Sequence, residues 1–276
     1  MPGYARLAAS AEFIEQVIRP QAFFDCLDRL SIPYPEVSYQ QPPANESWLY
    51  KQAFSCGGVG VSIEYAETPG YWQKRISGTP VSTLCIADPH QIRVIGFNQQ
   101  LTESLFPDVP YAYAGAIANH GISEKNRLKI EGYLNKLRKE IDLLGVFSMD
   151  MIVTDEQCYI LEINPRISAS FELYEQLNPG LNLVDAHNGV CEGERLPEFR
   201  LSAESCAYRI VYAKKALLIP AGIDWPEWVK DRPETGRIIQ CYEPICSLYA
   251  SAAESQVQAR LKQYEQELYV IINNKL

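Results

Sequence analysis

The stretches Gly145-Val-Phe-Ser-Met-Asp150-Met-Ile-Val153 and Tyr159-Ile-Leu-Glu162-Ile-Asn164-Pro-Arg166 decide how this chain can fold. Each is an apolar run of strand length, and the short polar turn Thr154-Asp-Glu-Gln157 separates them. Two such runs around a short turn are typical of an antiparallel β-hairpin. If the hairpin is symmetric about Glu156, Asp150 lies directly opposite Glu162.

Asp150 and Glu162 form an unfavourable pair in that hairpin unless something neutralises them. Facing residues of an antiparallel pair have Cβ atoms roughly 4.5–5.5 Å apart, where like charges repel. Asn164 projects from the same face as Glu162 because side chains alternate along a strand. Two carboxylates and an amide oxygen on an apolar patch are costly to bury without a cation or a proton. These oxygens suit magnesium, which commonly arrives with nucleotide phosphates. Asp150, Glu162 and Asn164 are therefore the predicted metal ligands.

Length and composition describe a globular chain with a substantial core: 276 residues, 47% hydrophobic and 21% charged. One large domain or two closely packed lobes both fit. The net charge of −9, without a dense Lys/Arg run, argues against a nucleic acid or an anionic membrane as partner. No apolar run reaches the roughly 18–20 residues of a membrane span, and the N-terminus lacks the apolar core of a signal peptide. The expected location is therefore the cytoplasm.

The rest of the sequence predicts a mixture of helices and antiparallel strands. Helical spacing occurs at 11–30 (divided at Pro20), 123–144 (with Ser123 as N-cap), 168–177, 182–191 and 252–268. Strands are expected at 47–53, 59–65, 71–76, 81–87, 92–100, 205–213, 216–219, 237–241 and 246–250. The segment 101–122, with several prolines and glycines, is expected to be irregular. This pattern predicts an α+β fold with helices packed against antiparallel sheets.

The segment Ser55-Cys-Gly57-Gly58-Val-Gly60 is a glycine-rich loop between two expected strands. Glycines at this density let backbone N–H groups turn toward an anion. The loop is neither a Walker A motif nor a Rossmann fingerprint, because no Gly-Lys-Ser/Thr and no helix follow it. Phosphate binding and a plain hairpin turn are both open, and Lys51 at the base of the loop favours the former.

Two further segments are candidates for ligand contacts. The strand Tyr71-Trp-Gln73-Lys74-Arg75-Ile76-Ser-Gly78 could lie against a purine through its backbone. Arg166 follows the acidic pair, and its planar fork suits a phosphate or acyl phosphate. A salt bridge to a neighbouring acid is the alternative for Arg166.

In this order, the segments resemble the ATP-grasp superfamily over roughly residues 20–250. Leu49–Gly60 looks like the phosphate-covering hairpin of that family, and Tyr71–Ser82 like the segment with the adenine-side contacts. Asp150 and Glu162-Ile-Asn164-Pro-Arg166 look like its metal ligands and phosphate-contacting arginine. The segments 231–236 and 243–250 resemble the branch of carboligases related to biotin carboxylase, which includes the tyramine–glutamate ligase of methanofuran biosynthesis.

The resemblance implies two α+β lobes with antiparallel sheets that clasp ATP, and Mg²⁺ as cofactor with Mn²⁺ as an alternative. ATP would phosphorylate a small-molecule carboxylate, and an amine or related nucleophile would attack the acyl phosphate, releasing ADP and phosphate. Lys51 and Arg166 would be the catalytic residues. The implied nucleotide contacts are Lys51, Ser55, Gly57, Gly58, Gly60, Gln73, Lys74, Arg75 and Ile76.

The resemblance also implies an organisation with a shortened N-terminal side. Residues 1–42 would be the remnant of the domain that usually precedes the grasp lobes, 43–100 the small lobe and 101–276 the large lobe. Arg19-Pro-Gln21 stands where the family usually has a lysine, Gln52 where proline is common, and Lys74 where an acid is frequent. A homodimer or a partner subunit is therefore expected to complete the site.

A second hypothesis is a degenerate member of the family that binds nucleotide or metabolite without turnover, as a subunit of a biosynthetic complex. The retained Asp150, Glu162, Asn164 and Arg166 favour the enzyme. The short N-terminal side and the missing lysine favour the binding protein. Nothing in the chain favours a carboxylase, because no biotin-carrier segment is visible.

Overall fold

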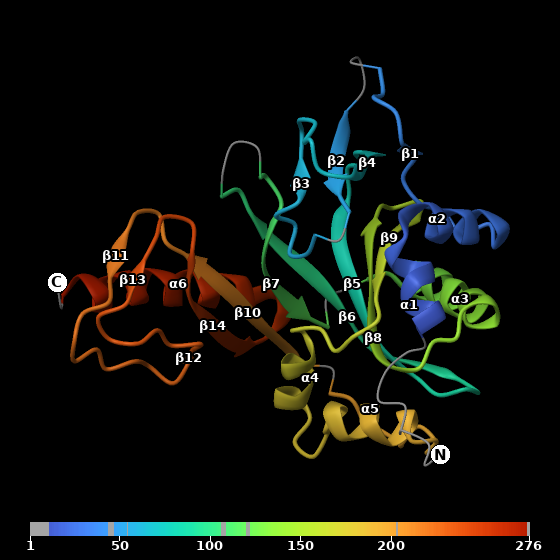
Figure 1. The fold of residues 1–276 in the computed structure, drawn as a ribbon. Helices are drawn as coiled ribbons and strands as arrows, with labels where there is room; N and C mark the ends of the chain where they lie inside the picture. Colours follow the sequence, from blue (N-terminus) through green and yellow to red (C-terminus); the bar gives the residue numbers. More distant parts are fainter. Residues whose placement is uncertain are drawn as a thin grey trace, which may run out of the picture.

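The computed structural model describes residues 11–43, 47–53, 55–105, 109–119, 122–202 and 204–274. Within these residues the largest element is an eight-stranded sheet with antiparallel pairing throughout (Figure 1). Its strands follow in the order β12 (Val229–Lys230), β14 (Pro244–Ala252), β10 (Ser205–Tyr212), β7 (Ala112–Ala118), β6 (Ile92–Glu103), β5 (Thr79–Ala87), β8 (Gly145–Val153) and β9 (Cys158–Asn164). The predicted α+β fold with antiparallel sheets is confirmed.

A smaller sheet of four short strands forms the upper part of the molecule in Figure 1. Its order is β1 (Val37–Ser38), β4 (Gly70–Lys74), β2 (Trp48–Gln52) and β3 (Val61–Ser62). Strand alternation gives this sheet two different faces, with Lys51 paired to Tyr71 on one and Tyr50 paired to Trp72 on the other. Tyr71 belongs to the main core, whereas Tyr50 and Trp72 form a separate cluster. The face that carries Lys51 is therefore turned toward the large sheet.

Three helices cover one face of β5, β6, β8 and β9: α1 (Ala11–Ile18), α2 (Pro20–Arg29) and α3 (Glu124–Glu140). Pro20 divides α1 from α2 as predicted, because a first-turn proline lacks only an N–H that the helix leaves unpaired. Ser123 caps α3 through a hydrogen bond that its Oγ accepts from the backbone N–H of Asn126, 3.3 Å away. The predicted boundaries of these helices therefore follow from local chemistry.

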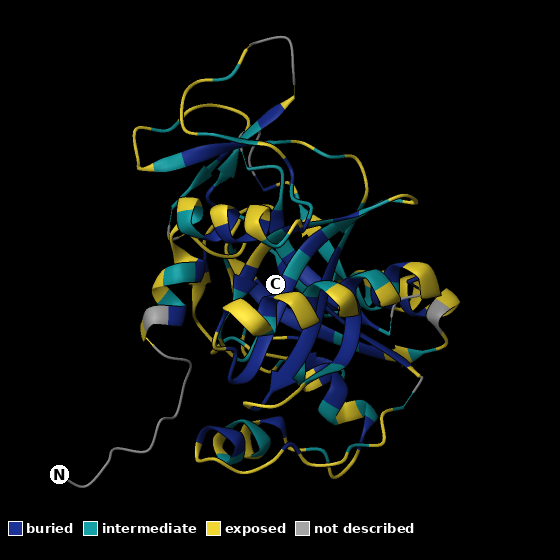
Figure 2. Ribbon diagram, turned by 90° about the vertical axis from the view of Figure 1, so that its right-hand side faces the viewer, coloured by how far each residue is buried: buried dark blue, intermediate teal, exposed yellow. Residues whose placement is uncertain are grey.

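The remaining helices cover the rest of the large sheet. The final helix α6 (Glu254–Asn273) packs on β10 and β14, and β11 (Leu217–Leu218) pairs with β13 (Ile238–Ile239) nearby. Helices α4 (Phe171–Leu177) and α5 (Leu183–Cys191) lie on the opposite face, against residues such as Leu84 and Ala116. Figure 2 shows the buried strands and the exposed outer sides of the helices that cover them. The face covered in part by α4 and α5 is also the one that carries Asp150, because Asp150 pairs with Ser82, two residues before Leu84.

Two sequence-based expectations are corrected by the topology. The segment 101–122 is not irregular throughout, since Ala112–Ala118 forms β7 in the middle of the large sheet. Its alanines gave no bulky β-branched pattern, yet small side chains fit where α4 and neighbouring tyrosines cover the strand. The expected lobe boundary at residue 100 also differs from the sheets, because β5 and β6 pair within the large sheet and the small sheet ends at Lys74.

Two short strands, β1 and β12, were not expected from the sequence. Each is only two residues long and is held by pairing with a longer neighbour. Within the described parts of the chain, no helix combines the length and apolar character needed to cross a bilayer.

Candidate functional site

The hairpin β8–β9 brings the two predicted carboxylates together. Asp150 and Glu162 are register partners as expected, but the hairpin is not symmetric about Glu156. Its turn pairs Val153 with Cys158, and a bulge immediately after Asp150 shifts the register by one residue to bring Asp150 opposite Glu162. The Asn164 amide Nδ2 donates to Asp150 Oδ2 at 3.3 Å and to Glu162 Oε1 at 3.1 Å. The convergence of these three side chains is therefore confirmed. An amide turned by 180° presents its oxygen in nearly the same place, so Asn164 can offer either a donor or an oxygen ligand here.

The raised pKa of Asp150 indicates that the acidic pair needs a proton or a cation. Burial raises the pKa of Asp150 to about 8, and the neighbouring charge of Glu162 adds to the shift, while Gln100 and Lys51 oppose it. A carboxyl group in this position holds a proton near neutral pH unless a cation replaces that proton. Among the described residues no three His, Cys, Asp or Glu side chains cluster as metal ligands, so this site has two carboxylates and one amide. That oxygen-only set fits a small hard cation that keeps other ligands from water or substrate.

Lys51 extends from β2 of the small sheet toward this pair. Its Nζ donates to Gln73 Oε1 at 3.2 Å and lies 6.0 Å from the centre of the Tyr71 ring. Burial disfavours its charge, but Tyr71, Glu162 and Asp150 outweigh that effect and raise the pKa of Lys51. The two sheets therefore contribute opposite charges to one site.

Gln73 is the clearest sign of an absent hydrogen-bond partner. The residue is 4% exposed, its Oε1 is occupied by Lys51, and its Nε2 has no partner among the described residues. An unsatisfied buried donor is costly, so a ligand acceptor at this point would relieve it. The sequence predicts a nucleotide contact at Gln73, and the structure leaves its amide N–H group without a partner among the described residues.

The glycine loop lies against β7 of the large sheet. The backbone carbonyl of Gly57 accepts a 2.8 Å hydrogen bond from the N–H of Tyr113. Gly57 and Gly58 have φ values of +67° and +72°, which non-glycine residues rarely adopt. A Cβ added at Gly58 would overlap the carbonyl oxygen of Tyr111, whereas one at Gly57 would meet nothing within 4 Å. Gly58 is therefore required by close approach as well as by its backbone angle.

The other loop residues shape the turn from within. The Ser55 hydroxyl donates to the carbonyl of Gln52 at 2.9 Å, at the base of the loop. Gly60 is buried, and a Cβ there would overlap the Ser55 side chain. In the described structure Ser55 and Gly60 thus stabilise the loop's own conformation.

Not every predicted contact joins the site through its side chain. Lys74 lies on the opposite face of the small sheet from Lys51, with its Nζ 3.4 Å from Glu36 and 5.8 Å from the Trp48 ring. Strand alternation explains this, since Lys74 follows Gln73 directly. Arg75 and Ile76 lie in the link between β4 and β5, where the Arg75 side chain is exposed.

Arg166 lies just beyond the end of β9, on the same segment as the acidic pair. Its side chain is exposed, and Nη1 donates to the carbonyl of Ile167 at 3.3 Å. In this conformation the Arg166 side chain contacts the Ile167 carbonyl and not the two carboxylates. It is free to turn toward an anion because only one neutral carbonyl holds it in the described structure.

Sequence reasoning missed three residues that border the site. Tyr71 faces Lys51 across the β2–β4 pair, and Gln100 lies near Asp150, as its effect on that carboxyl's pKa shows. Tyr113 borders the carboxylates too, since Asp150 contributes to the raised pKa of Tyr113. Only the register between distant strands reveals these neighbours. The position of Tyr71 opposite Lys51 is the one that strand alternation could have indicated.

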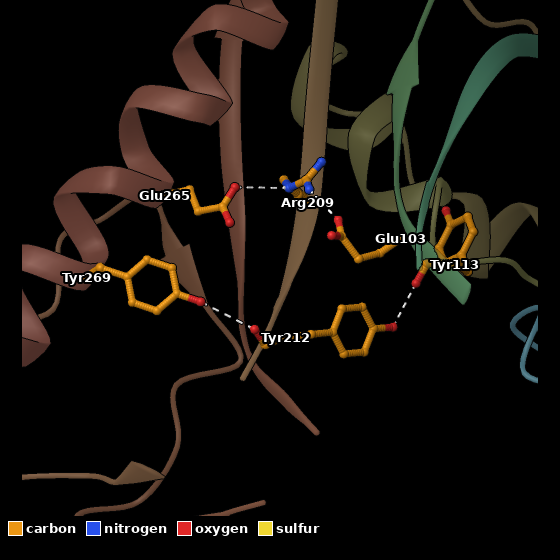
Figure 3. A network of polar contacts seen from close by, with 6 residues as sticks. All are labelled: Glu103, Tyr113, Arg209, Tyr212, Glu265 and Tyr269. Atoms are coloured by element: carbon orange, nitrogen blue, oxygen red, sulfur yellow. Dashed lines mark hydrogen bonds and ion pairs between the residues drawn. The ribbon is translucent and has the colours of Figure 1, made fainter. Parts of the chain in front are cut away.

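Two hydrogen bonds connect Tyr113 to the C-terminal part of the chain (Figure 3). The Tyr212 hydroxyl donates to the carbonyl of Tyr113 at 2.7 Å, and the Tyr269 hydroxyl of α6 donates to the carbonyl of Tyr212 at 3.3 Å. The strand on which the glycine loop rests is thus connected to α6.

Comparison with known proteins agrees with this geometry. A family model described as an ATP-grasp domain matches residues 21–170. The large chain of carbamoyl phosphate synthase from Lachnoclostridium phytofermentans is 21% identical over 223 residues, which are 71% of this chain and 20% of that protein. The chain therefore spans about a fifth of the length of this curated relative.

Several solved structures share the fold. L-amino acid ligase from Bacillus licheniformis aligns with a TM-score of 0.73 and 13% identity, covering 92% of this chain and 72% of that one. Carboxyaminoimidazole ribonucleotide synthase from Aspergillus clavatus aligns with a TM-score of 0.71 and 14% identity, covering 98% of this chain and 76% of that one. Biotin carboxylase from Campylobacter jejuni aligns with a TM-score of 0.68 and 16% identity, covering 92% of this chain and 67% of that one. With the family model matching more than half of its length, this chain belongs to the ATP-grasp family.

Proposed function

We propose that this protein is an ATP- and Mg²⁺-dependent carboxylate–amine ligase that acts on small molecules through an acyl phosphate. The observation that carries the proposal is the convergence of Asp150, Glu162 and Asn164 with Lys51 across the two sheets. This arrangement offers acidic oxygens for a cation and a buried ammonium for phosphate oxygens in one place. Such a pairing suits phosphoryl transfer, in which a protein contributes mainly position and electrostatics.

Each residue has a distinct role in the proposal. Asp150, Glu162 and Asn164 would hold Mg²⁺, or Mn²⁺ as an alternative, and the bound cation would offset charge on the ATP phosphates. Lys51 and Arg166 would stabilise charge that develops on the transferred phosphoryl group. The remaining proposed nucleotide contacts are Ser55, Gly57, Gly58 and Gly60 in the loop, Gln73 by its free amide, and the backbone of Lys74, Arg75 and Ile76.

The named relatives support a ligase of this kind. The structural neighbours include an amino acid ligase and a ribonucleotide synthase solved with ATP. A further neighbour, the biotin carboxylase domain of a 2-oxoglutarate carboxylase from Hydrogenobacter thermophilus, was solved with MgADP. A substrate pair like that of the tyramine–glutamate ligase, and a partner subunit that completes the site, remain part of the proposal.

A binding protein without turnover is the second candidate, and the surroundings of Arg19 favour it. Arg19 stands where the family usually has a lysine, yet its Nη2 lies 3.6 Å from Glu15 on an exposed surface. An arginine paired within its own helix region is not directed toward a nucleotide. The proposal therefore needs a test of turnover as well as of binding.

The test is ADP release across a matrix of carboxylic acids and amines. At least one pair should give turnover that falls by about 100-fold or more in Glu162→Gln, because loss of a carboxylate ligand weakens the binding of the cation that offsets phosphate charge. Glu156→Gln is the matched control, since Glu156 lies exposed at the turn of the same hairpin. It should leave turnover within about twofold.

Thermal stability separates the two candidates. ATP with Mg²⁺ should raise the melting temperature of the wild type, and ATP without Mg²⁺ should raise it much less. Magnesium-dependent stabilisation with no turnover from any substrate pair would establish the binding protein and overturn the ligase. If ATP raises the melting temperature equally with and without Mg²⁺, the assignment of Asp150, Glu162 and Asn164 as metal ligands is wrong.

A further inference from the structure

A second cavity lies on the face of the small sheet opposite Lys51. It has a volume of about 360 Å³ and is lined by the aromatic residues Tyr39, Tyr50, Tyr65 and Trp72, together with Gln41 and Glu67. Tyr50 and Trp72 are register partners on this face, so the wall that they form faces away from Lys51. Nothing in the proposed ligase chemistry uses it.

The rings around the cavity are inclined to one another. Tyr50 contacts Tyr65 with ring centres 5.1 Å apart at 62°, and contacts Trp72 at 5.2 Å and 65°. Tyr50 and Trp72 are 4% and 8% exposed and form the floor, whereas Tyr65 is 63% exposed and forms the rim. Inclined aromatic faces around one space are the geometry that attracts a rounded organic cation.

The charge at the cavity has the matching sign. Glu67 is the one charged residue among the described residues that line it. The same face of the sheet already holds a cation over an indole, since Lys74 Nζ lies 5.8 Å from the Trp48 ring. The Glu67 carboxylate favours a positively charged occupant over a neutral one, and the Lys74–Trp48 contact shows that an aromatic ring of this face can hold a cation.

The sequence builds this cavity with specific residues. A Cβ on Gly70 would lie 2.8 Å from Tyr50 Cζ, so only glycine leaves room for the Tyr50 ring. The Tyr50 hydroxyl donates to the carbonyl of Thr68 at 2.6 Å, which fixes the ring against the 63–69 segment. The floor of the cavity is therefore rigid before any ligand arrives.

We propose that this cavity binds the quaternary ammonium group of a small free molecule. The cation lies over the faces of Tyr65 and Trp72, and the Glu67 carboxylate offsets its charge. A quaternary ammonium suits the site better than a bare one, because its methyl groups contact the rings and its nitrogen has no N–H that would need a hydrogen-bond acceptor. The site is separate from the ATP-grasp site and its occupancy does not depend on turnover.

The test is calorimetric titration of the full chain with choline and with 3,3-dimethylbutan-1-ol, in which carbon replaces the charged nitrogen. Choline should bind saturably, and the affinity of the neutral isostere should be lower by at least about tenfold. Tyr65→Ala and Glu67→Gln should each weaken choline binding by about fivefold. Ile63→Ala is the matched control, because Ile63 is 56% exposed nearby without lining the cavity, and it should bind choline like the wild type.

Other outcomes would overturn the proposal. Equal binding of the isostere would mean that the cavity recognises apolar volume alone. Loss of choline binding in Glu162→Gln would place the ammonium at the ATP-grasp site, whereas unchanged binding there supports a separate site. A peptide carrying trimethyllysine that binds more tightly than choline would overturn the assignment to a free small molecule.

Discussion

Asp88, at the end of the β5–β6 hairpin, shows how a single buried charge is made favourable. Its Oδ1 accepts hydrogen bonds from the backbone N–H groups of His90 and Gln91, at 2.7 and 2.9 Å. Its Oδ2 accepts one from the N–H of Leu196 at 3.1 Å. Burial alone would raise the pKa of Asp88, but these hydrogen bonds outweigh burial and lower it. One side chain thus joins a turn to a distant loop.

Replacing Asp88 by Asn should therefore destabilise the fold in a pH-dependent way. Its folded pKa lies below the unfolded value, so its ionised form stabilises the protein above the unfolded pKa. That stabilisation is lost as the pH falls through the folded pKa. Asp88→Asn should lower the free energy of unfolding by about 1–3 kcal/mol at neutral pH and less in acid. Urea unfolding between about pH 2 and pH 7 measures this.

Asp155→Asn is the control for Asp88, because Asp155 lies exposed in the turn of the β8–β9 hairpin. It should change the unfolding free energy by less than about 0.5 kcal/mol. A loss in Asp88→Asn that stays constant across the acid range would contradict the role of the ionised carboxylate.

At the scale of elements, the glycine loop and β7 act as a pair. Gly57 accepts from Tyr113, and Gly58 approaches the carbonyl of Tyr111 too closely for any side chain. Both glycines have positive φ, so a substitution at either position strains the backbone. Only Gly58 adds a collision with the neighbouring strand.

The two glycines therefore provide a matched comparison. Gly58→Ala should prevent the loop from resting on β7 and lower kcat/KM for ATP by about 30-fold or more, since misplaced catalytic groups are costly. Gly57→Ala should lower it only a few-fold, from backbone strain of about 1 kcal/mol. Steady-state kinetics with varied ATP gives both values. Equal losses would show that conformational strain, and not the close approach to Tyr111, limits the loop.

The connection from α6 to β7 makes a second prediction at this scale (Figure 3). The Tyr212 hydroxyl donates a hydrogen bond to the carbonyl of Tyr113, and the backbone N–H of Tyr113 donates one to Gly57 in the glycine loop. Tyr212→Phe removes that hydroxyl while keeping the ring, and should raise KM for ATP about three- to tenfold with little change in melting temperature. Tyr264→Phe, in α6 and stacked on Trp228, is the control and should leave KM unchanged. An unchanged KM in Tyr212→Phe would mean that β7 positions the loop unaided.

At the scale of the whole molecule, Arg209 joins three parts of the fold. Its guanidinium contacts Glu103 of β6 at 2.6 Å and Glu265 of α6 at 3.2 Å, while its own strand is β10 (Figure 3). The Arg209 side chain is 26% exposed, so solvent screens these pairs in part. The network nevertheless fixes α6 against the large sheet through both carboxylates.

Arg209→Met should consequently destabilise the protein by about 1–3 kcal/mol, because two carboxylates lose their shared counter-charge. Arg93→Met is a comparable change at an arginine of similar exposure whose partner Glu198 is 95% exposed. That variant should lose less than about 1 kcal/mol. Chemical unfolding of both variants gives the comparison. A smaller loss in Arg209→Met than in Arg93→Met would contradict a structural role for the network.

The sequence by itself determined the elements whose causes are local. Pro20 divides two helices, Ser123 caps a third, and the polar turn after Val153 sets the β8–β9 hairpin. These features depend on backbone geometry and on residues close in sequence, which is why pattern and spacing suffice. The alignment of Asp150 with Glu162 needs in addition the bulge after Asp150, which the spacing of the turn did not indicate.

Only the tertiary structure decided which distant strands meet. The central place of β7, the pairing of β5 and β6 within the large sheet, and the turn of Lys74 away from Lys51 depend on register between segments far apart. The approach of Lys51 to the carboxylates and the unpaired amide of Gln73 arise where the two sheets face each other. Side-chain alternation fixes what each strand offers, but packing between strands fixes what that side chain contacts.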